Sequence, residues 1–549
     1  MYKEKLNFLP EDIYNQYTKG CEYKESLGDN GIYEQSKINE RFFVGDQWYG
    51  AECGNNRPLV RRNLIKRIGE YKLACISNSP VTVNYSADGV PNTTELKADK
   101  QDVIEKLKQG KEFTGKTNIA EIAAVMDAIS QYFSVTSERV KFYAKTEEAL
   151  RNAFISGTGI VYTYWDPTIE TGLYADERLT TPIKGDIAFD VLNVENVCFG
   201  DPYETDLQKQ PYIIINQYLE LNKVKAMALA NGIPNREIEK IVPDVKHAYS
   251  NNKVTVLTKI HKEKQENGET KVYAVMVTKN AVVKMPWCLN LKNYPLAKFN
   301  WERRQNSAYG ESEITYLIPN QIALNRALTA EVWALMAAGM PITVVNGDAV
   351  NVPISNDPGQ VITVYPGLDF DLSNAVKHVT PPAFESQYQS AIGSLANDTL
   401  TDSGATDAAL GSLNLDNATA LIQMREAAML PMQSYVNRFY DFCEDIARIW
   451  ADFWVNLYGN RRIKYVDSFG THYMLFNAKR YKNLVINAKV DVGASTIRSE
   501  GVVLAALDNL LKENLITFDQ YLERVPDGLI PNVTGLRREI KRNEGKAEE

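Results

Sequence analysis

The chain has 549 residues, of which 44% are apolar and 24% charged, and its formal net charge is −8. These values are typical of a folded protein with several hydrophobic cores, and the acidic balance argues against a protein that clamps nucleic acid tightly. We expect no secretory signal in the charged first residues, and no apolar stretch reaches the roughly 18 residues that a membrane-spanning helix needs.

The N-terminal part is predicted to be mainly helical. Residues 1–80 read as helices with a loop between them, and the segment KINERFFVGDQWYG (37–50) is amphipathic and ends in aromatic residues. Residues 55–85 predict a turn, a helix and then a strand after Pro80. The polar residues 86–118 are interpreted as an exposed insertion with a short helix at 98–108.

A long helix is predicted next, over residues 119–154, followed by a β-rich region. The helix should stop at SGTG (156–159), because a glycine there can adopt the left-handed conformation of a helix cap. A strand at 160–166 and a mainly β segment at 182–285 follow, the latter with one helix near 221–232. Within it, Asn267-Gly268 predicts a hairpin turn between strands 253–262 and 271–279.

The C-terminal half is dominated by long helices. The residues between them, 341–381, are rich in proline and read as loops with short strands at ITVV (342–345) and QVITVYPG (360–367). We expect a kink at Pro431, because a proline inside a helix removes a backbone donor and clashes with the preceding turn. The elements predicted in this half are helices at 311–339, 383–400 and 418–457, strands within 461–491, helices at 499–514 and 517–525, and a charged tail at 536–549.

The sequence shows little that indicates catalysis. Its four histidines are not at metal-ligand spacing, and P-loop, H-E-x-x-H and G-x-S-x-G motifs are absent. We therefore predict no catalytic residue, no metal site and no cofactor. The scattered cysteines are interpreted as free, structural thiols rather than disulfides or zinc ligands: Cys21, Cys53, Cys75, Cys198, Cys288 and Cys443.

The helix predicted over 311–339 is unusual, because ALTAEVWALMAAGM (327–340) is apolar on nearly every side. A helix of this kind is buried on more than one face. Two interpretations stay open. The helix is either the central core helix of one domain, or it packs between copies of itself in a ring.

The order of these elements resembles that of the portal proteins of tailed bacteriophages. The resemblance rests on the order of several stretches along the chain and not on one strong motif. They are RFFVGDQWYG (41–50) with the following RPLVRRNLIKRIGEYKLACISNSPVTV, EEALRNAFISGTGIVYTYWDP (147–167), NVENVCFGDP (193–202) and YGESEITYLIPNQIALNRALTAEVWALMAAGMP (309–341). The resemblance covers roughly residues 35–525.

This resemblance implies an α+β portal fold, with long stem helices, a β-rich wing and clip and a helical crown, assembled as a ring. It assigns the parts of the chain as follows: wing 1–310 and 460–495, first stem helix 311–340, clip 341–382, second stem helix 383–400, tunnel loop 401–417, kinked long helix 418–459 and crown 496–549. The insertion at 86–118 has no counterpart in this scheme.

The resemblance also implies a channel loop that faces DNA. The segment TDSGATDAALGSLNLDN (401–417) has no lysine or arginine, so its aspartates would repel phosphate and limit sticking. An ordinary surface turn is the alternative. The residues expected to line the channel are Asp402, Ser403, Gly404, Thr406, Asp407, Leu410, Gly411, Asn414 and Asp416.

The implied function is a channel at one capsid vertex for packaging and ejection of double-stranded DNA. The expected partners are further copies of the chain, about twelve in the ring, DNA without sequence specificity, the large terminase subunit, a head–tail adaptor and the major capsid and scaffolding proteins, with no membrane. The location implied is the virion, after assembly in the bacterial host cytoplasm. The residues expected to dock the motor and the adaptor are Asn346, Asp348, Asn351, Asn356, Asp357 and Gln360 of the clip.

Two other functions stay open at this stage. A soluble multidomain enzyme, such as a hydrolase with an unrecognised carboxylate pair, would fit the composition. Another phage connector or capsid-associated structural protein would share the element order.

Overall fold

The structure is a computed structural model of the chain. It describes residues 9–50, 59–77, 81–87, 119–174, 180–247, 250–266, 268–339, 342–345, 376–379, 386–405, 430–467, 470–477, 481, 486–491, 507–513 and 515–525. The chain divides into two units. Unit 1 comprises Met1–Lys37, Tyr71–Glu313 and Asp407–Glu549, and unit 2 comprises Ile38–Glu70 and Ile314–Thr406.

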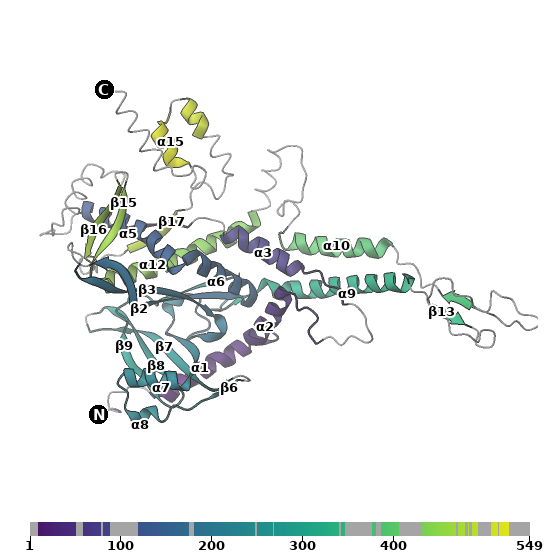
Figure 1. Cartoon of the computed structure of the whole chain (residues 1–549), viewed down its shortest axis with the longest axis horizontal. Coiled ribbons are helices and arrows are strands. Elements are labelled where there is room, and N and C mark those ends of the chain that lie inside the picture. Colours follow the sequence, from purple (N-terminus) through teal and green to yellow (C-terminus); the bar gives the residue numbers. More distant parts are fainter. Residues whose placement is uncertain are drawn as a thin grey trace, which may run out of the picture. The chain divides into compact units, whose positions relative to one another are not determined.

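Helices and sheets are mixed along the chain, which confirms the predicted α+β class (Figure 1). The helices are α1 (Pro10–Glu25), α2 (Gly31–Val44), α3 (Leu64–Ser77), α5 (Ile119–Val140), α6 (Phe142–Ser156), α7 (Leu221–Ala230), α8 (Asn235–Ile238), α9 (Glu313–Gly339), α10 (Ser386–Asp402), α12 (Gln433–Leu457) and α15 (Phe518–Arg524). In the part described, no helix is both long enough and apolar enough to cross a membrane.

The strands form several small antiparallel sheets and one larger one. Their bounds are β1 (Thr82–Ala87), β2 (Thr158–Tyr174), β3 (Pro182–Asn193), β4 (Val197–Phe199), β5 (Tyr212–Glu220), β6 (Val245–His247), β7 (Ser250–Lys264), β8 (Thr270–Val277), β9 (Val282–Cys288), β10 (Leu296–Asn300), β11 (Glu302–Arg303), β12 (Gly310–Glu311), β13 (Ile342–Val345), β14 (Val376–Val379), β15 (Asn460–Asp467), β16 (Gly470–Asn477) and β17 (Ile486–Asp491).

The larger sheet of unit 1 has the order β4-β5-β7-β8-β9, with β6 paired to β7. Helices α1 and α7 pack against it and contribute Ile13, Val224 and Ala228 to a core formed with apolar strand residues. The predicted hairpin is confirmed, since β7 pairs with β8 in the register Lys264↔Thr270. Gly268 in its turn has a φ of 81°, the left-handed conformation that glycine adopts without strain.

A second core of unit 1 is built from aromatic rings on α12. Its apolar residues recur at helical spacing, so Phe439, Cys443, Trp450 and Trp454 are all buried. The Trp450 ring lies 5.0 Å from that of Phe133 and close to two other phenylalanine rings. Such tilted and edge-to-face pairs stabilise a core beyond the area they bury.

The single helix predicted over 119–154 is wrong in one respect, because the structure divides it at Lys141. This residue has a φ of 57° and separates α5 from α6. The left-handed conformation costs a non-glycine residue about 1–2 kcal/mol. Burial of the next residue offsets that cost: Phe142 is fully buried and contacts the rings of Trp450 and Phe189.

The predicted helix stop is confirmed at Gly157, which caps α6 with a φ of 85°. Two further glycines, Gly159 and Gly310, lie in close contact with main-chain atoms of other elements. A Cβ atom added at Gly159 would lie 2.0 Å from the carbonyl oxygen of Ala149 in α6, and one added at Gly310 would lie 2.4 Å from that of Gly157. Three glycines therefore let α6, β2 and β12 approach one another at backbone distance.

In unit 1, the buried Lys24 and the half-buried Lys298 both donate hydrogen bonds to main-chain carbonyl oxygens. The Lys24 Nζ donates hydrogen bonds to the carbonyl oxygens of Val194, Glu195 and Val197, at 3.2, 2.7 and 3.3 Å. The Lys298 Nζ donates to the carbonyl oxygen of Ala308 at 2.7 Å. Burial disfavours the charged form and lowers the pKa of Lys298 to about 8.

The cysteines within the described residues are free thiols, as the sequence predicts. They are Cys21, Cys75, Cys198, Cys288 and Cys443. Several predicted features lie outside the described residues: Cys53, the insertion at 86–118 with its helix at 98–108, the strand at 360–367 and the tail at 536–549.

Candidate functional site: the long helices of unit 2

Helix α9 is 27 residues long and carries only three charged side chains, Glu313, Arg326 and Glu331. Its buried residues Leu317, Gln321 and Leu324 recur every three or four positions and so share one face. Large apolar side chains are exposed elsewhere on the helix, with Leu335 61% and Met336 46% exposed. The helix predicted at 311–339 is confirmed as Glu313–Gly339, and it contains Pro319.

Three polar residues of α9 bind the main chain of the segment before α3. Gln321, Asn325 and Thr329 are four residues apart and lie on one side of the helix. The amide N–H of Leu64 donates to Gln321 at 2.9 Å, that of Arg62 to Asn325 at 3.1 Å and that of Val60 to Thr329 at 3.1 Å. We refer to these contacts as the amide ladder.

The amide ladder can form because the rise of the helix matches the advance of the extended segment. Four residues of α-helix rise about 6.0 Å. Two residues of an extended chain advance about 6.6 Å. Every second residue of the segment therefore meets every fourth residue of α9, and Gln321 Nε2 adds a bond to the carbonyl oxygen of Arg62 at 2.7 Å.

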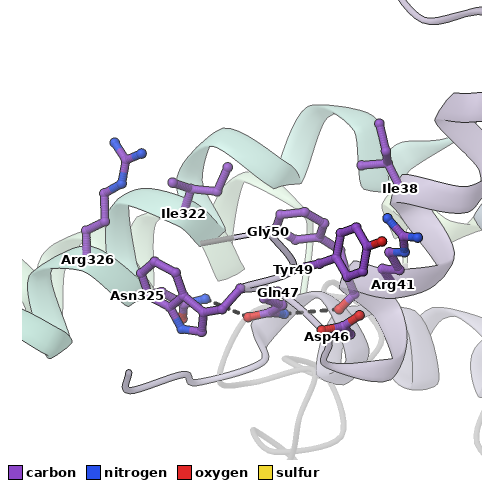
Figure 2. Close-up of a pocket in the computed structure, with 11 residues that line it drawn as sticks. Ile38, Arg41, Asp46, Gln47, Tyr49, Gly50, Ile322, Asn325 and Arg326 are labelled. Atoms are coloured by element: carbon purple, nitrogen blue, oxygen red, sulfur yellow. Dashed lines mark hydrogen bonds between the residues drawn. The ribbon is translucent and has the colours of Figure 1, made fainter. Parts of the chain in front are cut away.

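The GDQW element (45–48) is joined to the same ladder. Gln47 accepts a hydrogen bond from Asn325 at 2.6 Å and donates one to the carbonyl oxygen of Phe42 at 3.0 Å. The indole N–H of Trp48 donates to the carbonyl oxygen of Val60 at 3.2 Å. Figure 2 shows Gln47 between Asn325 and the end of α2. The glutamine and the tryptophan thus fasten the end of α2 to α9.

A pocket of about 450 Å³ lies beside this element (Figure 2). Arg41 and Arg326 are among its lining residues and Asp46 is its single carboxylate. The guanidinium of Arg41 stacks on the Tyr49 ring at 3.5 Å. The pocket is therefore basic and partly aromatic, which suits an acidic side chain. Among the described residues no group of three or more His, Cys, Asp or Glu could hold a metal ion.

Helix α10 lies beside α9, and its Gln389 donates to Glu331 at 3.2 Å (Figure 1). It carries two charged residues, Asp398 and Asp402, both exposed. Its buried side contains Ala396, Thr399 and Leu400.

The start of the predicted tunnel loop belongs to the end of α10. Asp402 is the last helical residue, and Gly404 has a φ of 78° and donates its N–H to the carbonyl of Thr401 at 2.9 Å, which ends the helix. Ser403 is buried and its hydroxyl donates to the carbonyl oxygen of Leu400. The other residues expected to line the channel lie outside the described residues: Thr406, Asp407, Leu410, Gly411, Asn414 and Asp416.

The predicted strand ITVV (342–345) is confirmed as β13, which pairs with β14 in the register Ile342↔Val379. The docking residues expected between them lie outside the described residues: Asn346, Asp348, Asn351, Asn356, Asp357 and Gln360.

Pro431, expected at a kink, lies in a 3-10 turn, Leu430–Met432, directly before α12. A proline is tolerated at a helix start, where its missing N–H would have no helical partner. Residues 418–429, the predicted first part of this helix, lie outside the described residues, so the kink stays a prediction.

The sequence predictions missed the residues that make the clearest contacts in unit 2. Gln321, Asn325 and Thr329 stand out only as polar residues at a spacing of four on a mostly apolar helix. That spacing was visible in the sequence. Their partner, the main chain of residues 60–64, lies more than 250 residues away in the chain and carries no sequence signal.

Comparison with known families agrees with this architecture. A family model described as Phage P22-like portal protein matches residues 186–499, which is more than half of the 549-residue chain. The match includes the larger sheet of unit 1, α9, α10 and α12. A comparison with individual curated proteins gave no match. The chain therefore belongs to the P22-like family of phage portal proteins, structural components of the virion that serve in the packaging of viral DNA.

Proposed function

We propose that copies of this portal protein form a closed ring around a channel through which double-stranded DNA enters and leaves the capsid. The observation that carries the proposal is α9, with three charged residues in 27 positions. A long helix that exposes Leu335 and Met336 leaves apolar surface uncovered in a single chain. Identical neighbours in a cyclic assembly would cover that surface.

We assign the parts of the chain on the same basis. α9 is the first stem helix (311–340), α10 forms most of the second (383–400) and extends two residues beyond it, and β13 and β14 belong to the clip at 341–382. α12 belongs to the long helix at 418–459. The remaining parts are the wing at 1–310 and 460–495, the tunnel loop at 401–417 and the crown at 496–549.

The charge of the chain supports a conduit rather than a DNA clamp. The net charge is −8, and segment 401–417 has three aspartates and no basic residue. A channel surface that binds few phosphates has few contacts that must break as DNA moves, and it does not recognise individual bases. We infer that DNA passes without sequence specificity.

The partners follow from the portal role. The clip residues 346–360 dock the large terminase subunit during packaging and a head–tail adaptor afterwards. The wing contacts major capsid and scaffolding proteins at one vertex of the virion, after assembly in the host cytoplasm. Twelve copies is the number that the family resemblance implies.

Light scattering of the purified chain tests the ring. A ring of twelve has about twelve times the 61.9 kDa of one chain, and negative-stain images should show particles with a central hole. A monomer at every protein concentration would contradict the proposal.

Two variants test the assignments of the tunnel loop and of the clip. Replacing Asp402, Asp407 and Asp416 by alanine should slow DNA passage or increase its retention while the ring still forms. Unchanged packaging would contradict the assignment of this loop to the channel.

Deleting residues 346–378 should give a ring that no longer recruits the terminase, and continued recruitment would contradict the clip assignment.

A further inference from the structure

Two opposite charges on the exposed sides of the long helices have no ion-pair partner among the described residues. Arg326 lies on α9 and Asp398 on α10, and both are exposed. The arginine lies at the edge of the basic pocket, together with Arg41 (Figure 2). Because α10 has no basic residue and the pocket has two, the two surfaces are complementary in charge.

The rest of both exposed faces is small or uncharged. Around Arg326, the exposed residues of α9 at helical spacing are Tyr316, Pro319, Ala323 and Ala330. Around Asp398, those of α10 are Ala391, Ser394 and Thr401, with a second carboxylate at Asp402. A face that only meets water is usually rich in charged residues. Apart from Tyr316, the side chains of these faces are short, and short side chains permit another helix to approach closely.

The two charges also lie at similar heights along the helices. α9 and α10 run in opposite directions side by side, with Gln389 at the level of Glu331 (Figure 1). Asp398 is nine residues from Gln389, about 14 Å, and Arg326 is five residues from Glu331, about 8 Å, at 1.5 Å per residue. The remaining difference of about 6 Å is within the reach of an extended arginine side chain.

We propose that α10 of a neighbouring copy packs on the exposed face of α9 and places its Asp398 against Arg326. This inference rests on the proposed ring. A cyclic ring whose axis runs along the helices relates neighbours by rotation alone, so heights along the axis are kept from copy to copy. The basic pocket of one subunit is thus occupied by the acidic side of α10 from the neighbouring subunit.

Charge reversal tests the pair in the full-length chain. Arg326→Glu and Asp398→Arg should each raise the protein concentration needed for half-assembly at least tenfold, because each places like charges at the contact. The double variant, Arg326→Glu with Asp398→Arg, should return to within about threefold of the wild type. Arg236→Glu, at an exposed arginine of α8, is the matched control and should assemble as the wild type does.

The outcomes separate this inference from the ring itself. Single variants that assemble like the wild type, or a double variant no better than either single one, would overturn the pair while leaving the ring intact. A wild-type chain that never assembles would instead refute the ring, and the pair with it.

Cysteine cross-linking keeps the test valid if a reversal impairs folding. The variant with Arg326→Cys and Asp398→Cys, mildly oxidised, should give a ladder of covalent multimers on a denaturing gel. Neither single cysteine variant should give this ladder, which controls for the native thiols. A bond formed only within one chain, or no ladder at all from assembled rings, would contradict the proposal.

Discussion

The close contact between β2 and α6 allows a sharp prediction for Gly159→Ala. The added Cβ would lie 2.0 Å from the carbonyl oxygen of Ala149, whereas real Cβ contacts are essentially never below 3.0 Å. The two backbones would therefore have to separate by at least 1.0 Å. Because the obstacle is main chain of a helix rather than a flexible side chain, we expect a loss near the upper end of the usual overpacking cost, about 3 kcal/mol.

Gly393→Ala is the matched control, since the chemical change is the same. A Cβ at Gly393 meets nothing within 4 Å in the chain, and the residue lies inside α10. Alanine in a helix interior is favoured over glycine by about 0.5–1 kcal/mol. This variant should be slightly more stable than the wild type.

Urea unfolding followed by tryptophan fluorescence measures both variants, and calorimetry shows whether one or more transitions are affected. We expect Gly159→Ala to lower the midpoint of the transition that includes the Trp450 core. Equal stability of Gly159→Ala and the wild type would show that β2 and α6 can move apart without cost, and would refute the close-contact argument.

Three further predictions concern buried polar groups. Lys24→Met should destabilise the protein by about 2 kcal/mol in urea unfolding, because three carbonyl oxygens lose a charged donor; an unchanged midpoint would contradict this. Burial lowers the pKa of Lys298 from 10.5 to about 8, so between these pH values the unfolded chain binds more protons and stability rises with pH. Lys298→Met should lower that slope by up to about 1.4 kcal/mol per pH unit, and parallel profiles would refute the assignment. Gln321→Leu should speed hydrogen exchange at the Leu64 amide, with no change at a distant amide of β8.

The elements that the sequence predicts well are those with a local pattern. The hairpin at Gly268 and the cap at Gly157 depend on the conformational freedom of one residue, so they can be read from a few positions. Helix α9 was predicted to within two residues because its composition changes at both ends.

The break at Lys141 shows where such reasoning fails. No glycine or proline marks it, and the residues on both sides favour a continuous helix. The chain turns there because Phe142 is buried among rings from β3 and α12, which lie about 50 and 300 residues away in the chain. Long-range packing of this kind has no local signature.

The candidate site was predicted only in part, for the same reason. The GDQW element was singled out by resemblance, but the role of Gln47 became clear only from its contact with Asn325, 278 residues away. The pocket residues Arg41 and Arg326 are unremarkable surface residues in the sequence and meet only in the folded unit.

The amide ladder has a consequence for how this part of the chain can vary. Gln321, Asn325 and Thr329 recognise N–H groups rather than side chains, so most substitutions at Val60 and Arg62 should leave the docking intact. Proline is the exception at both positions, because it has no N–H to donate. A mutational scan should therefore show that positions 60 and 62 tolerate almost every residue except proline, whereas the three helical positions opposite them tolerate very few.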